Sequence, residues 1–355
     1  MTPNLLPALV LLASIAPIAP PGSGVDPALA KRYFQEAQWA SDDDGGKLWG
    51  VKLYGPTLFF DPATGEVIAN QADGEKKLTT KDGVFTGKVP KDFAGANTAL
   101  DWAGVHWTVV LWPLPGTTVE RTRLVLHESW HRIQGDIGLP GESVRNEHLG
   151  TKDGRIWLLM EYRALSKALP AWGAERTRAL EDALAFREYR RSLFAEAAEQ
   201  EDRMEVHEGL AEYTGLACSG LGNDGARYYL SNRLKLAALK PALSYAFAYE
   251  TGPAYGLMLD MSGKDWRKDL APSGSLSALL AEWNHIDPGD PTLEQVTERA
   301  RAYDGDALIA AETKKDAEAK LAEAKYRREF VTGPVLRLPL VEKNYTFDPN
   351  AVVPL

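Results

Sequence analysis

Residues 124–134 read LVLHESWHRIQ, and the five residues HESWH at 127–131 form the pattern H-E-x-x-H. On an α-helix, residues four positions apart lie on the same face, one turn above the other. His127 and His131 would therefore direct two imidazoles toward one metal ion, and Glu128 would reach a water molecule beside it. This pattern predicts a catalytic zinc site. The alternative is two surface histidines that lie near each other by chance.

The flanking sequence predicts the helix that this motif requires. Thr117 and Glu120 form a T-x-x-E capping box, the usual signal for a helix start. Apolar residues recur at helical spacing after it, and the segment GDIGLPG from Gly135 onward predicts the end. We expect a helix over about 118–134, with the motif in its second half.

Length and composition favour a globular protein. The chain has 355 residues, of which 45% are hydrophobic and 25% charged, enough for one large core or two smaller ones. A net charge of −9 without a basic tract argues against nucleic acid as a partner. Cys218 is the only cysteine, which excludes an internal disulfide and a cysteine-rich metal site.

The N-terminus indicates export. An apolar run from Leu5 to about Ala19 is interrupted by Pro7 and Pro17 and is too short for a comfortable transmembrane helix. We therefore expect a signal peptide over 1–24. The mature protein is then expected to be secreted or periplasmic, with no stable membrane insertion after cleavage.

Three further regions follow, and together they predict an α+β fold. A β-rich region is expected over 25–115, a mostly helical region over 116–330 and a C-terminal β tail over 331–355. The segment HWTVVLWPLP at 106–115 is a candidate sheet edge, which could pair with an extended substrate. Helices are expected, besides the motif helix, over 154–169, 174–217, 226–239, 293–303 and 311–330.

A hydrolytic zinc site uses three protein ligands and keeps one position for water. Two histidines therefore need a partner, and the segment HEGLAEYTG at 207–215 offers one. Its Glu-Gly-Leu-Ala-Glu-Tyr part resembles the E-G-x-A-x-Y segment of gluzincins, the zinc peptidases related to thermolysin and aminopeptidase N. The resemblance implies that Glu208 is the third zinc ligand. It also implies that Glu212 takes the place of a carboxylate that orients a ligating histidine.

Glu161 is an alternative third ligand. It lies 30 residues after His131, a more usual spacing for the group, whereas Glu208 lies 77 residues after it and requires a long helical insert. Glu161 could equally be a helix charge that pairs with Arg187 or Arg190. The flanking residues match the group better at Glu208, which we favour.

A third segment resembles aminopeptidases of the same group, which carry a Tyr in a Y-E-x-G segment that leads into an apolar helix. Residues 249–252 read YETG and precede PAYGLMLD. The resemblance implies that the Tyr249 hydroxyl donates a hydrogen bond to the oxyanion of the reaction. Tyr245 and Tyr255 are alternatives, and Tyr249 could instead be an ordinary half-buried aromatic residue. The G-x-M-E-N segment that binds a free amino terminus is not found, so aminopeptidase specificity is not indicated.

The sequence therefore predicts an exported, zincin-like zinc metallopeptidase that acts on peptides or proteins. His127, His131 and Glu208 would hold Zn²⁺, and Glu128 would act as the general base. Two alternatives remain: a zinc hydrolase of a non-peptide amide or ester, and a non-catalytic zincin-like binding protein.

Overall fold

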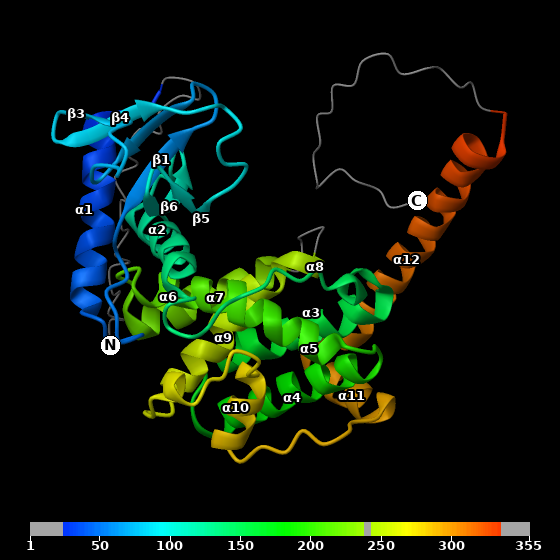
Figure 1. The fold of residues 1–355 in the computed structure, drawn as a ribbon. Coiled ribbons are helices and arrows are strands. Elements are labelled where there is room, and N and C mark those ends of the chain that lie inside the picture. The colour runs from blue at the N-terminus through cyan, green and yellow to red at the C-terminus, as the bar shows by residue number, and fades with distance from the viewer. Residues whose placement is uncertain (1–23, 238–242, 335–355) are drawn as a thin grey trace, which may run out of the picture. The chain divides into compact units, whose positions relative to one another are not determined.

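The computed structural model describes residues 24–237 and 243–334 (Figure 1). Nearly all of the predicted signal peptide and nearly all of the predicted β tail lie outside these residues. The chain combines a six-stranded sheet with many helices, which confirms the expected mixture of α and β structure. It divides into two compact units. The first comprises Met1–Pro140 and Thr214–Gly222, and the second comprises Gly141–Tyr213 and Asn223–Leu355.

The first described element of the first unit is a helix, α1 (Pro27–Asp44), which was not expected within the β-rich region. Asp26 caps it by accepting hydrogen bonds from the first turn, and Gly45 ends it with a φ of 59°. Its buried residues recur at helical spacing: Ala30, Tyr33, Phe34, Ala37 and Ser41. These signals are local, so the sequence itself contained the evidence for this helix.

A six-stranded mixed sheet follows, in the order β3-β4-β2-β1-β6-β5. Only the pair of β1 and β6 is parallel. The strands are β1 (Thr57–Asp61), β2 (Glu66–Ala69), β3 (Thr79–Lys81), β4 (Val84–Lys88), β5 (Thr98–Trp102) and β6 (Val105–Leu111).

The prediction that 106–115 forms a sheet edge is wrong. β6 lies between β1 and β5, so its backbone groups are paired on both sides. Ala103 and Gly104 connect β5 to β6, and both have positive φ angles, 49° and 74°. Two residues of this conformation make a tight hairpin turn. The turn folds β5 back onto β6 and makes β5 the edge strand.

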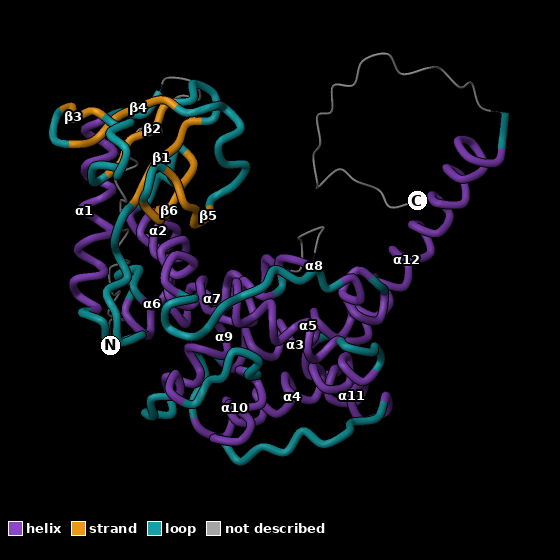
Figure 2. The backbone as a smooth tube through the Cα atoms, viewed as in Figure 1, coloured by secondary structure: helices purple, strands orange, loops and turns teal. Residues whose placement is uncertain are grey.

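The two faces of the sheet bury different side chains, because successive residues of a strand point to opposite sides. Phe59, Ile68 and Val110 pack with α1 and with Val125 of the motif helix, α2 (Thr118–Ile133). The opposite face carries a second cluster that includes Trp107. Both α1 and α2 therefore cover the same face, and the motif helix is fixed along the sheet (Figure 2).

The second unit is helical (Figure 2). Its longer helices are α3 (Lys152–Ala168), α4 (Gly173–Ser192), α5 (Ala197–Met204), α7 (Gly222–Ala237), α9 (Ala248–Asp260), α10 (Leu276–Trp283), α11 (Leu293–Ala300) and α12 (Gly305–Arg327), and α8 (Leu243–Ala246) is a single turn. The helices α3 and α4 pack against each other. Within the described residues, no helix is both long enough and apolar enough to cross a membrane.

The long helix expected over 174–217 is divided into parts. After α4, Glu196 adopts a left-handed conformation with a φ of 62°, and α5 begins immediately afterwards. A π-helical turn, η2 (Glu205–Gly209), then joins α5 to α6 (Leu210–Ala217). The residues Thr214–Gly222, which include the end of α6, belong to the first unit.

Candidate metal centre

The helix that carries the motif begins and ends close to the positions expected from its sequence. Thr117 is its N-cap, and its hydroxyl oxygen accepts a hydrogen bond from the backbone N–H of Glu120 at 3.2 Å. The helix ends at Ile133, within one residue of the predicted end. The prediction of this helix is thus confirmed.

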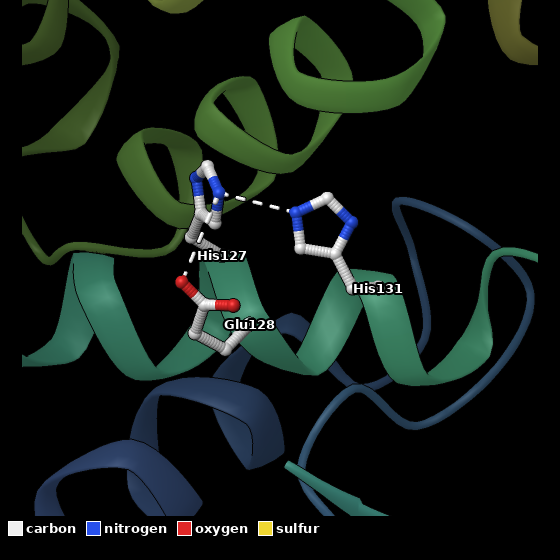
Figure 3. Close-up of side chains that lie close together, drawn as sticks. All are labelled: His127, Glu128 and His131. Atoms are coloured by element: carbon white, nitrogen blue, oxygen red, sulfur yellow. Dashed lines mark hydrogen bonds and ion pairs between the residues drawn. The ribbon is translucent and has the colours of Figure 1, made fainter. Parts of the chain in front are cut away.

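His127, Glu128 and His131 lie together on α2 (Figure 3). The Nε2 atoms of the two histidines are 3.3 Å apart, and Oε1 of Glu128 is 4.0 Å from Nε2 of His127. His127 and Glu128 are buried, with 4% and 5% of their surface exposed, whereas His131 is half-buried. The three residues can hold a metal ion, because their ligand atoms all lie within 4.8 Å of one another.

The separation of the two ring nitrogens fits two ligands of one ion. With Zn–N distances of about 2.0–2.1 Å and a tetrahedral angle, the two nitrogens would be about 3.4 Å apart. The observed 3.3 Å is close to this value. It is longer than the usual N–H hydrogen bond, which spans about 2.7–3.2 Å. The geometry therefore suits two ligands of a shared cation.

Contacts of residues next to the motif hold α2 in place. The buried indole of Trp130 packs against Trp49, with ring centroids 4.4 Å apart, and the Trp49 ring nitrogen donates to the Thr214 hydroxyl at 2.9 Å. At Gly215 a Cβ atom would lie 2.3 Å from the backbone oxygen of Arg123. A glycine at this position therefore lets the segment Thr214–Gly222 approach α2 closely. The sequence contained no local signal for the roles of Trp49 and Gly215.

Glu208 belongs to the second unit and lies in the π-helical turn η2. Such turns are rare in proteins and occur frequently at functional sites. Its side chain is 7% exposed, and its Oε1 accepts a hydrogen bond from the Tyr245 hydroxyl at 3.0 Å. Burial and the adjacent negative charge of Glu208 raise the pKa of Tyr245 above its usual value. The Tyr245 hydroxyl therefore stays protonated and able to donate at neutral pH.

The π-helical turn is anchored by buried contacts. Glu205, its first residue, accepts hydrogen bonds from Arg187 at 3.0 and 2.6 Å and from the Thr251 hydroxyl at 2.5 Å. Gly209, its last residue, meets Gly252 of α9 so closely that a Cβ atom at Gly252 would lie 2.3 Å from the Gly209 Cα atom. The turn that carries Glu208 is thus fixed at both ends.

Glu212 and Tyr249 meet the same arginine. The guanidinium of Arg233 donates to a carboxylate oxygen of Glu212, to the backbone oxygen of Tyr249 and to Glu250, the last at 2.8 Å. The rings of Tyr249 and Tyr245 are neighbours, with centroids 6.2 Å apart. The second unit therefore brings Tyr249 close to the tyrosine that bonds Glu208.

Glu161, the alternative ligand, lies in a buried ionic cluster of the second unit. Arg187 donates to its Oε1 at 2.9 Å, and Arg190 donates to its Oε2 at 2.5 Å. The expectation that Glu161 pairs with these arginines is confirmed. Burial alone would raise the pKa of Glu161, but the charges of Arg190 and Arg187 outweigh it and hold this pKa below its usual value. Both of its carboxylate oxygens therefore accept hydrogen bonds from arginines.

Tyr255, one of the alternatives to Tyr249, belongs to the same cluster. Its hydroxyl donates to Oε1 of Glu161 at 2.7 Å, and its side chain is fully buried. It therefore acts in the core of the second unit.

Comparison of the chain with the models of known protein families, with curated proteins and with solved structures finds no match.

Proposed function

We propose that this protein is a zinc-dependent hydrolase that cleaves peptide bonds, and the observation that carries the proposal is the pairing of His127 with His131. Their Nε2 atoms are separated by the distance expected for two ligands of one zinc ion. The carboxylate of Glu128 lies beside them on a buried part of the same helix. Two histidines that only bound a metal ion would not need the carboxylate of Glu128 beside them.

Glu208 completes the proposed ligand set. Its carboxylate is buried and lies on a π-helical turn. The resemblance of its segment to gluzincins supports the same role. Two imidazole nitrogens and one carboxylate leave one position open on a four-coordinate zinc ion, as catalytic sites require. In this proposal Glu212 orients a ligating histidine.

The chemistry depends on proton transfer by Glu128. A zinc ion at this centre would polarise the substrate carbonyl and lower the pKa of the water that attacks it. Glu128 accepts a proton from that water as the new C–O bond forms, and then delivers it to the nitrogen of the breaking C–N bond. The hydroxyl of Tyr249 donates a hydrogen bond to the oxyanion that develops on the carbonyl oxygen. Tyr245, bonded to Glu208, is the alternative donor.

The proposal extends to the fold and to the location of the protein. A β-rich part before the motif helix and a helical part after it form the order that a zincin-like enzyme would have, and the order of elements supports this assignment.

The apolar run after the N-terminus supports export as a secreted or periplasmic protein. Sequencing the N-terminus of protein recovered from its native cells tests the second point, because an intact Met1 would contradict cleavage.

The decisive experiment replaces Glu128 by glutamine. Glutamine keeps the size and polarity of the side chain but cannot accept the water's proton. Glu128→Gln should therefore retain zinc and reduce cleavage of a mixed peptide library, followed by mass spectrometry, by about a hundredfold or more. Glu120→Gln, on the first turn of the same helix, is the matched control and should cleave like the parent. A Glu128→Gln variant as active as the parent would overturn the proposal, as would a parent protein that binds no zinc.

A further inference from the structure

A cavity of about 290 Å³ lies in the second unit, lined by residues of α4, α7 and α9. Its lining combines two arginines, two aspartates and apolar side chains, among them Arg176, Arg227, Asp224, Asp260, Trp172 and Leu257. Its volume is just below the range for ligand pockets, about 300–1,000 Å³, so it suits only a small molecule. None of these residues belongs to the proposed metal centre.

Apart from the ion pair of Arg227 with Asp224, the two arginines that line this cavity have only weak acceptors. The side chain of Arg227 is only 7% exposed, and its buried Nε finds no hydrogen-bond partner among the described residues. Its Nη1 donates to the sulfur of Met261 at 3.2 Å, and Nη1 of Arg176 lies 3.7 Å from the same sulfur. A thioether is a weak acceptor. Because a buried donor without a good acceptor costs free energy, an oxyanion at this point would be stabilised.

The local charges favour an anion with a single charge. Asp224 bonds Arg227 from the solvent side, with 78% of its side chain exposed, and Asp260 accepts from Arg267 at 2.6 Å. These pairings leave Arg176 without an ion pair in the described part of the chain. Arg176 therefore has no carboxylate partner of its own, and the carboxylate of a ligand would supply one.

An aromatic ring and apolar side chains lie beside the guanidiniums of the two arginines. The guanidinium carbon of Arg227 lies 4.6 Å from the centre of a Trp172 ring, and that of Arg176 lies 5.7 Å from it. Leu257 and Met261 add apolar surface. We propose that this cavity binds a small aromatic monocarboxylic acid. Its carboxylate bonds the planar forks of Arg176 and Arg227, which match a carboxylate in geometry, and its ring packs on the apolar wall.

Isothermal titration calorimetry of the full chain with phenylacetate tests this site. We expect saturable binding with one molecule per chain. Phenylacetamide, which has the same shape without the charge, should bind at least about tenfold more weakly, since a charge-assisted pair contributes that much. Inorganic phosphate, which lacks the ring, should also bind more weakly. Equal binding of phenylacetamide, tighter binding of phosphate, or no heat from phenylacetate up to about 20 mM would each overturn the proposal.

Variants locate the binding. Arg176→Gln should weaken phenylacetate at least about tenfold, while Arg178→Gln, an exposed arginine on the same helix, should leave it within about twofold. Because Arg176 is half-buried, its variant remains informative if Arg227→Gln fails to fold. His127→Ala should bind phenylacetate like the parent, which separates this cavity from carboxylate binding at the metal centre. Full affinity in Arg176→Gln, or loss of binding in His127→Ala, would place the acid elsewhere.

Discussion

Arg187 holds Glu205 with two hydrogen bonds, of 3.0 and 2.6 Å, and at the same time bonds Glu161 at 2.9 Å. One arginine thus joins α3 to the first residue of the turn that carries Glu208. The side chains of Arg187, Glu161 and Glu205 are at most 1% exposed. The two glutamates considered as metal ligands therefore have different surroundings. Glu161 pairs directly with buried arginines, whereas Glu208 lies on the turn that Arg187 anchors through Glu205.

The first prediction concerns Glu161. Glu161→Gln should lower the free energy of unfolding by about 3 kcal/mol or more, because it leaves Arg187 and Arg190 without one of their buried countercharges. Urea unfolding monitored by circular dichroism measures this. The folded variant should keep its zinc. If it loses zinc and keeps its stability, Glu161 is the third ligand.

The second prediction reverses this pattern for Glu208. Glu208→Gln should lose most of its bound zinc at limiting metal concentration, since an amide is a poor zinc ligand, while its unfolding free energy in the presence of a chelator changes little. Competition with a zinc-binding dye gives the affinity. Glu199→Gln, an exposed residue of α5, is the control. Unchanged zinc affinity in Glu208→Gln would remove this residue from the ligand set.

The third prediction concerns the two histidines. The parent should contain about one zinc ion per chain, and His127→Ala and His131→Ala should each abolish it, because a site with one of its imidazoles missing cannot close around the ion. Elemental analysis of purified protein measures the content. His106→Ala should keep the zinc, because His106 is exposed on β6 and bonds Asp101. Zinc retained in both motif variants would contradict the assignment.

The features predicted correctly are those encoded locally. The motif helix was recognised from its N-cap residue Thr117, its apolar spacing and its end, and the facing of His127 and His131 follows from a separation of four residues. The same local reasoning could have found α1, whose Asp26 cap and Gly45 end were overlooked.

The features missed depend on contacts between distant segments. The segment 106–115 was expected to form a sheet edge, but the hairpin at Ala103 and Gly104 places β5 outside β6. The close approach of Gly215 to Arg123 and the packing of Trp49 on Trp130 join residues far apart in the sequence. One sequence without relatives offers no signal for such pairs, because many glycines and tryptophans could fill these roles.

The fourth prediction is that the packing of α12 against α3 depends on pH. Arg155 of α3 bonds both oxygens of Glu312, at 2.7 and 3.1 Å. Burial alone would raise the pKa of Glu312, but Arg155 outweighs it and lowers this pKa below 4.5. A lowered folded-state pKa contributes stability above pH 4.5, and this stability is lost as the pH falls through the folded-state value. Acidification should therefore loosen the attachment of α12 to α3.

Hydrogen exchange across 305–317 at pH 7 and at about pH 4 measures this loosening, after correction for the intrinsic effect of pH. The protection should fall in the parent at the lower pH. In Glu312→Gln it should already be low at pH 7 and change little, because no charge remains to be neutralised. Glu318→Gln, an exposed residue of the same helix, should behave like the parent. Equal protection at both pH values in the parent would contradict the prediction.

The last prediction distinguishes the two tyrosines near Glu208. If the Tyr249 hydroxyl stabilises the oxyanion, Tyr249→Phe should leave zinc content and thermal stability almost unchanged and lower kcat by about 100- to 1,000-fold, the value of one such donor. KM should change less than kcat, because the hydrogen bond strengthens only as charge develops on the oxygen. Tyr245→Phe should act differently. Its hydroxyl already donates to Glu208, so its loss should lower zinc affinity by about 10-fold, as for other groups that orient a ligand.

Measuring kcat, KM and zinc affinity for both variants separates the roles. Ring contacts are kept in both, since phenylalanine retains the aromatic ring and the neighbouring rings of Tyr245 and Tyr249 stay packed. Tyr228→Phe, which alters an exposed tyrosine of α7, controls for the general loss of a hydroxyl. If Tyr245→Phe shows the large loss of kcat at saturating zinc and Tyr249→Phe behaves like the parent, then Tyr245 is the oxyanion donor, and the YETG segment resembles the aminopeptidase pattern by chance.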